Sequence, residues 1–160
     1  MRLEQMRTLG SVLAVCAALT ASFVPASSQA WQQYIRFDRI TPADGLPEEY
    51  VMSMAQDSFG YIWFATGAGL ARYDGHDFRV YRGDPNDPGA LSSSTVISVY
   101  VDREGTVWAG TDAGLNRFDR ATETFEHFRH DPDDPNSLGG NVVKEIFEDS
   151  RGNLWIGHWF

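Results

Sequence analysis

The sequence is poor in cysteine, in lysine and in long apolar runs, and each shortage excludes a class of protein. Cys16 is the only cysteine among 160 residues, so the chain forms no internal disulfide. Lys144 is the only lysine, and the net charge of −9 argues against nucleic acid or an anionic membrane as a partner. The longest apolar stretch, residues 9–24, is shorter than the roughly 20 residues of a membrane-spanning helix.

The first thirty residues differ in composition from the rest of the chain. Arg2 and Arg7 make a weakly basic start, and the apolar stretch follows them. Ser28 and Ala30 then place small residues where a signal peptidase would cleave, just before Trp31. This pattern predicts a cleaved secretory signal peptide at residues 1–30, and an uncleaved membrane anchor is the alternative.

A short motif occurs three times at nearly constant spacing. Each copy has an aspartate, a glycine three residues later and a tryptophan three residues after that, at Asp57–Trp63, Asp102–Trp108 and Asp149–Trp155. The steps between the tryptophans are 45 and 47 residues. A repeat of this length is typical of one four-stranded blade of a β-propeller.

The middle copy predicts four short strands, at residues 95–101, 106–111, 115–119 and 124–130, with turns rich in Asp and Gly between them. The first copy predicts strands near 49–56, 61–66, 69–74 and 77–82. Residues 33–38 have the aromatic spacing of a fourth strand, which we expect to complete the last blade of a closed ring. The expected fold class is all-β, an incomplete β-propeller of four-stranded antiparallel blades.

The repeat phase divides the chain into five expected parts. They are a signal peptide (1–30), an N-terminal strand and lead-in (31–48), blade 1 with its loop (49–94), blade 2 with its loop (95–141) and a partial blade 3 (142–160). The third copy stops after its second strand, which favours an N-terminal piece of a longer protein over a truncated gene product.

The recurring residues form a signature that we expect to be structural. The tryptophans should pack between blades, with stacking on a sugar as the alternative. Arg72 and Arg117 recur in register, which favours ion pairs or turn contacts for their side chains. These two arginines and Tyr50 are also weak ligand candidates. The signature residues are Asp57, Gly60, Trp63, Thr66, Gly69, Leu70, Arg72, Asp74, Asp102, Gly105, Trp108, Thr111, Gly114, Leu115, Arg117, Asp119, Asp149, Gly152 and Trp155.

No catalytic, cofactor or metal residue is predicted. No Ser/His/Asp arrangement, paired-carboxylate spacing or phosphate-binding glycine loop is found. The one metal-like cluster is His127, His130, Asp131, Asp133 and Asp134. In a strand its two histidines would point to opposite faces, so a solvated strand end is favoured over a metal site. Calcium at the Asp-Pro loops (84–91 and 131–138) is a further alternative.

The longer string Asp-x-x-Gly-x-hydrophobic-Trp-x-x-Thr-x-x-Gly-Leu-x-Arg-aromatic-Asp resembles the two-component regulator propeller repeat. It is complete at Asp57–Asp74 and Asp102–Asp119, and partial from Asp149 onward. The third copy departs from it at His158, where the others have Thr66 and Thr111, and at Trp159 and Phe160. The resemblance covers about residues 34–160.

The resemblance implies a periplasmic sensory module without catalytic activity of its own. Family members are bacterial membrane receptors in which the propellers precede a membrane helix and an output domain, either a histidine kinase or a diguanylate cyclase. Implied partners are a small-molecule or oligosaccharide ligand, the missing blades of the full-length chain and a second receptor copy in a homodimer. The alternatives are a secreted propeller enzyme, of lyase or glycosidase type, and a structural propeller for protein contacts.

Overall fold

The computed structural model describes residues 36–159, so the expected signal peptide and residues 33–35 of the expected N-terminal strand lie outside it. The chain divides into two units, Met1–Asp38 and Arg39–Phe160. In the first unit the described residues 36–38 form no strand, and Arg36 pairs with Asp38 at 3.0 Å. A strand that completes a further blade therefore stays a prediction.

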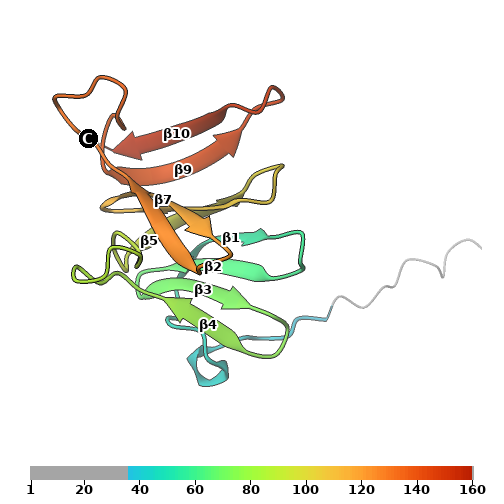
Figure 1. Ribbon diagram of the computed structural model, residues 1–160. Coiled ribbons are helices and arrows are strands. Elements are labelled where there is room, and N and C mark those ends of the chain that lie inside the picture. The colour runs from blue at the N-terminus through green and yellow to red at the C-terminus, as the bar shows by residue number, and fades with distance from the viewer. Residues whose placement is uncertain (1–35, 160) are drawn as a thin grey trace, which may run out of the picture. The chain divides into compact units, whose positions relative to one another are not determined.

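The second unit consists of antiparallel sheets that follow one another in chain order (Figure 1). A 3-10 turn, η1 (Pro42–Asp44), precedes them. The first sheet has the order β1-β2-β3-β4, the second β5-β6-β7-β8, and the third pairs β9 with β10. The strands are β1 (Val51–Gln56), β2 (Ile62–Thr66), β3 (Gly69–Tyr73), β4 (Phe78–Tyr81), β5 (Val96–Val101), β6 (Val107–Thr111), β7 (Gly114–Asp119), β8 (Thr124–Phe128), β9 (Val142–Glu148) and β10 (Leu154–Trp159).

This arrangement confirms the expected all-β fold of four-stranded propeller blades. Within residues 39–159 two blades are complete, the third has two strands, and the strands do not close a ring. Each first strand carries a register shift at the same place, as at Val51/Ser53 in β1 and Val96/Ser98 in β5. β10 runs through Trp159, so the repeat register continues into the segment where the sequence departs from the pattern.

The aspartate of each repeat motif organises the turn after the first strand. In the first blade Asp57 Oδ1 accepts the backbone N–H groups of Phe59 and Tyr61, at 3.0 and 3.1 Å. Its Oδ2 accepts the indole N–H of Trp63 at 3.0 Å. Gly60 has φ +88°, which side-chain-bearing residues rarely adopt. The Asp, Gly and Trp thus recur together because one turn requires all three.

Successive blades pack through their inner strands and a shared aromatic cluster. β5 lies against β1 and β2, and β9 lies against β5 and β6. Between the first two blades, Trp63 is fully buried and its ring centroid lies 5.1 Å from that of Phe118 in β7. Tyr81 and Phe125 complete the same cluster. Burial of these large rings is the main apolar contribution to blade docking.

The three motif tryptophans differ in how they are covered. Trp63 is buried between two complete blades, whereas Trp108 is partly buried, next to Phe128 of its own sheet and against the cluster that contains Val143 and Ile146 of β9. Trp155, in the two-stranded third sheet, is 62% exposed. The expected inter-blade position is therefore found at Trp63 and, with partial burial, at Trp108, while for Trp155 it stays a prediction.

Candidate functional site

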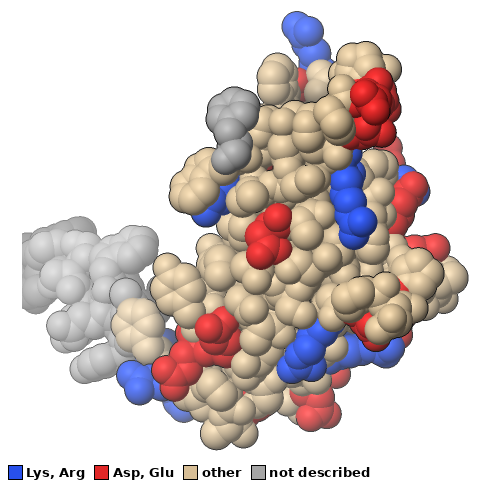
Figure 2. Space-filling view, turned by 90° about the vertical axis from the view of Figure 1, so that its left-hand side faces the viewer, with Lys and Arg blue, Asp and Glu red and all other residues tan. Residues whose placement is uncertain are grey.

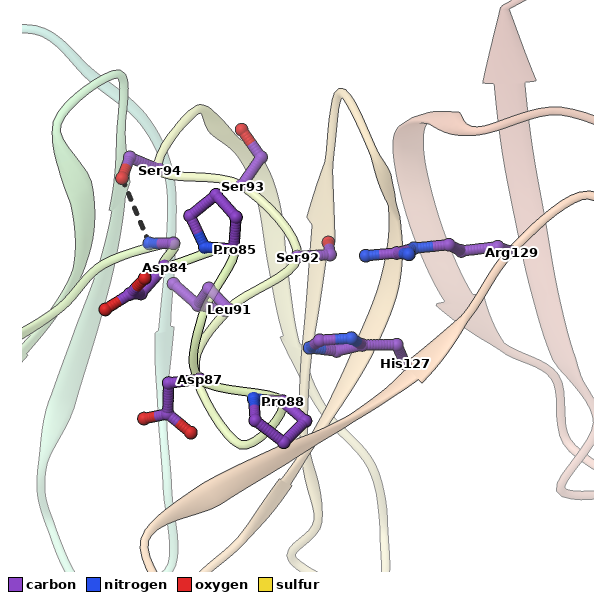
Figure 3. Close-up of a pocket in the computed structure, with 11 residues that line it drawn as sticks. Asp84, Pro85, Asp87, Pro88, Leu91, Ser92, Ser93, Ser94, His127 and Arg129 are labelled. Carbon is purple, nitrogen blue, oxygen red and sulfur yellow. Dashed lines mark hydrogen bonds between the residues drawn. The ribbon is translucent and has the colours of Figure 1, made fainter.

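A cleft of about 570 Å³ opens between the loop that joins the two complete blades and the outer strand β8 (Figure 3). This volume lies in the range of small-molecule sites. The residues that line it are Gly83, Asp84, Pro85, Asp87, Pro88, Leu91, Ser92, Ser93, Ser94, His127 and Arg129.

The loop wall is held rigidly by its own aspartates and by one leucine. Asp84 Oδ1 accepts the backbone N–H of Asn86, and Asp87 Oδ1 accepts that of Gly89, both at 2.9 Å. Each carboxylate thus closes a turn, as is usual for Asp in a loop. Leu91 is 2% exposed and belongs to the core cluster between the first two blades.

A buried asparagine ties the same loop to the second blade. Asn116, in β7, is fully buried, and its Oδ1 accepts the backbone N–H of Ser92 at 2.8 Å. Its Nδ2 donates to Ser92 Oγ at 2.9 Å and to the carbonyl of Ala109 at 3.1 Å. The first blade has Ala71 at the same repeat position, so recurrence gave no signal for this residue.

His127 and Arg129 extend from the end of β8 toward the loop (Figure 3). His127 Nε2 lies 2.7 Å from the carbonyl oxygen of Ala90, so this nitrogen carries the proton and donates it. The Arg129 guanidinium has no hydrogen-bond acceptor within residues 36–159. Both side chains also line a second, more apolar hollow of about 440 Å³ beside Trp108 and Leu138.

The metal-like cluster of the sequence is separated by the fold. His127 contacts Ala90, whereas His130 Nδ1 lies 2.6 Å from the carbonyl of Leu138 in the following loop. Asp131 and Asp134 accept backbone N–H groups inside that loop. In the described part of the chain, no three His, Cys, Asp or Glu side chains are placed to hold a metal ion.

The arginine and tyrosine candidates from the sequence do not line the cleft. Arg72 pairs with Glu123 of the next blade at 3.2 Å, and its guanidinium lies 4.8 Å from the ring centre of Tyr61. Arg117 pairs with Glu126 on the neighbouring strand. Tyr50 is 70% exposed at the start of the first blade. The two arginines therefore make ion pairs within and between the blades.

Asp57 is a buried carboxyl group that is kept ionised by its hydrogen bonds. Burial by itself raises the pKa of this carboxyl group, but hydrogen bonds from Arg120, Trp63 and Phe59 outweigh burial and lower the pKa below 3.8. Arg120 belongs to the second blade, and its Nη2 lies 2.7 Å from Asp57 Oδ2. The ionised aspartate thus connects its own turn to the adjacent blade.

Charged side chains do not form a single patch on the face shown in Figure 2, where acidic and basic groups are scattered among uncharged residues. The net negative charge of the chain is therefore not concentrated at one site on this face. A site for a charged ligand has to be argued from local groups.

Known proteins share the repeat pattern. A profile of the two-component regulator propeller matches residues 45–68, 90–113 and 137–160, and each match runs from the lead-in of a blade to the end of its second strand. The chain belongs to the two-component regulator propeller family. In the two complete copies the signature from the aspartate to the threonine lies within a match, whereas the part that begins at Gly69 and at Gly114 follows the end of the match.

Proteins similar to this regulator propeller include a histidine kinase and extracellular domains of two-component systems. The chain is 36% identical over 87 residues to Histidine kinase P4 of Formosa agariphila, and this match covers 54% of the chain and 6% of the relative. Two solved extracellular domains of candidate hybrid two-component systems from B. thetaiotaomicron are also similar. The first has a TM-score of 0.68 at 31% identity, covering 74% of this chain and 17% of that domain. The second has a TM-score of 0.56 at 33% identity, covering 68% and 15%.

The regulator propeller therefore spans a small part of the length of each of these relatives. Within residues 36–159 there is no helix long and apolar enough to span a membrane.

Proposed function

We propose that this regulator propeller is the sensory input region of a bacterial transmembrane receptor and acts by binding a small molecule. The observation that carries the proposal is the three-repeat family match, together with the likeness to extracellular domains of two-component systems. The cleft beside β8 supports it, because it offers a rigid, partly polar site of suitable volume. Function is argued from this site, since the propeller fold alone serves many activities.

The proposed location is the periplasm. The basic start, the apolar stretch and the small residues before Trp31 support export by a signal peptide. The solved relatives are extracellular domains, which supports the same location. In this proposal the chain continues into further blades, a membrane helix and an output domain, either a histidine kinase or a diguanylate cyclase, and the receptor is a homodimer.

Export is tested by fusing residues 1–160 to an alkaline phosphatase that lacks its own signal, because this enzyme needs disulfides that form outside the cytoplasm. We expect an active fusion. A matched variant, Leu13→Asp, interrupts the apolar stretch and should abolish the activity. An inactive but stably produced parent fusion contradicts the proposal, as does equal activity of parent and variant.

A further inference from the structure

We propose that the cleft between the 84–94 loop and β8 binds an anionic, hydroxyl-bearing small molecule, and that Arg129 holds its oxyanion. This inference rests on the proposed function and adds the chemical class of the ligand. The hydrogen-bonding capacity of the cleft lining is unequally divided between donors and acceptors.

Arg129 provides the largest uncommitted donor group. A guanidinium carries five N–H donors and no acceptor, and it remains charged at all physiological pH values. Other arginines at the blade contacts are paired, as Arg72 is with Glu123 and Arg120 with Asp57. Within residues 36–159 Arg129 has neither an ion pair nor a side-chain hydrogen bond, although it lines the cleft. A planar guanidinium in this state matches a carboxylate or phosphate group.

Two serine hydroxyls add further donors along the loop. Ser93 Oγ accepts the backbone N–H of Thr95 at 3.1 Å, and Ser94 Oγ accepts that of Gly83 at 3.0 Å. Their acceptor capacity is thus partly used, while neither O–H proton has an acceptor among the described residues. By contrast, Ser92 Oγ is already held by Asn116 and lies 2.8 Å from Thr111 Oγ1. The spare capacity of the loop therefore favours a ligand rich in acceptor oxygens.

The acidic residues of the loop do not cancel this preference. Asp84 and Asp87 line the cleft, but their carboxylates point away from Arg129 (Figure 3). One oxygen of each is also bound to a backbone N–H within the loop. The part of the cleft next to β8 is thus lined by Arg129, His127 and Ser92, and no carboxylate lies among them.

The first blade supplies a matched control position. Arg82 follows Tyr81 at the end of the first blade, as Arg129 follows Phe128 at the end of the second. Arg82 is exposed like Arg129 but does not line the cleft. Replacing either arginine removes one surface charge at the same repeat position, so a difference between the two variants reports on the cleft.

The test is isothermal titration calorimetry of the full 160-residue chain with three probes that share one sugar ring. Glucuronate carries a carboxylate, glucose 6-phosphate carries a phosphate, and glucose is neutral. We expect at least one anion to bind about tenfold or more tightly than glucose, because hydrogen bonds to charged groups are the strong ones. Binding should also weaken as the salt concentration rises. The preferred anion distinguishes a carboxylate ligand from a phosphate ligand.

Arg129→Gln should lower the affinity for the anion to that for glucose, and Arg82→Gln should leave it unchanged. If Arg129→Gln does not fold by tryptophan fluorescence, Arg129→Lys keeps the charge without the planar fork and should give an intermediate loss. Equal binding of glucose and both anions, no binding of any probe, or equal losses in the Arg82 and Arg129 variants would overturn the inference. These outcomes concern the cleft alone, whereas failure of export contradicts the receptor proposal.

Discussion

At the scale of single residues, Asp57 joins the turn, the core and the neighbouring blade. Its side chain is completely buried, and it accepts hydrogen bonds from two backbone N–H groups, from Trp63 and from Arg120. Removing such a carboxylate leaves several donors without an acceptor, which costs more than the net value of the bonds themselves.

We expect Asp57→Ala to lower the free energy of unfolding by about 2–4 kcal/mol, because the Trp63 indole N–H and the Arg120 guanidinium lose their acceptor. Denaturant unfolding followed by tryptophan fluorescence measures this loss. Asp149→Ala is the control: its carboxylate makes the same turn and tryptophan contacts, but on an exposed part of the third sheet. A loss in Asp149→Ala as large as in Asp57→Ala would contradict this account.

Because the pKa of Asp57 is lowered in the folded chain, the stability of the fold should depend on pH. The pKa of Asp57 is lowered in the folded chain, despite burial, by its hydrogen bonds, and the pKa values of Asp74 and Asp119 are lowered mainly by backbone N–H donors. A group with a lowered folded-state pKa stabilises the fold above its unfolded pKa of about 3.9 and stops doing so as the pH falls through the folded value.

These carboxylates should therefore change the free energy of unfolding by an amount on the order of only tenths of a kcal/mol between pH 5 and 7. At pH values below about 4, we expect the free energy of unfolding to decrease. Asp57→Asn should show a smaller fall, because one of the titrating groups is gone. Thermal unfolding across this pH range tests the prediction. A stability that rises on acidification would contradict it.

At the scale of structural elements, Glu123 connects the turn between β7 and β8 to the first blade. Its carboxylate pairs with Arg72 and Arg79, and its Oε1 lies 3.5 Å from the hydroxyl of Tyr81. Glu123 is the only non-glycine residue in the described part of the chain with positive φ, at 55°. This turn is two residues longer than its counterpart in the first blade, and the extra length brings the carboxylate to the neighbouring blade.

We expect Glu123→Ala to destabilise the chain by about 1–2 kcal/mol through loss of these contacts. Glu123→Gly loses the same contacts but relieves the left-handed backbone, so it should be more stable than Glu123→Ala by about 0.5–1 kcal/mol. Paired denaturation curves measure the difference. If the glycine variant is the less stable of the two, the backbone at this turn is not strained as described.

Gly110 allows the third sheet to approach the second. A Cβ atom at this position would lie 2.6 Å from Val143 Cγ1 of β9 and would also overlap Ser98 Oγ of β5. We expect Gly110→Ala to cost about 1–3 kcal/mol, because the contact cannot relax without moving β9 away from β6. Gly157→Ala, at the same repeat position on β10, is the control, since its Cβ would approach only Glu145, at 3.3 Å. Similar costs in both variants would contradict this packing.

At the scale of the whole molecule, the hairpins could be predicted from the sequence and the cleft could not. Turn residues such as Asp57, Gly60 and Gly69 impose local geometry, so strand ends in the two complete blades lie within two residues of the expected positions. The fourth strand of the second blade ends at Phe128 rather than at residue 130, because His130 is held by the following loop. Wherever a turn sets the end of a strand, the turn residues were enough to predict that end.

The cleft was missed although some of its residues recur, since Arg129 has Arg82 at the same repeat position and the Asp-Pro loop has a second copy at 131–138. Asn116, Ser92 and Arg129 come together only after the 84–94 loop folds back onto the second blade, and the sequence carries no spacing that reports this. The residues that appear in every copy of the repeat are the easiest to recognise in a sequence, and they maintain the scaffold. The proposed site depends instead on where one loop lies relative to its blade, and function has to be argued from such a site rather than from the fold.

The central claim is that this regulator propeller is the input region of a membrane receptor, and the gene sequence downstream of the Phe160 codon tests it most directly. The account predicts an open frame that continues with Gly-Leu-x-Arg-aromatic-Asp, further blades, a membrane helix and a histidine kinase or diguanylate cyclase domain. A frame that ends after the propeller, with no membrane helix and no output domain, would contradict it.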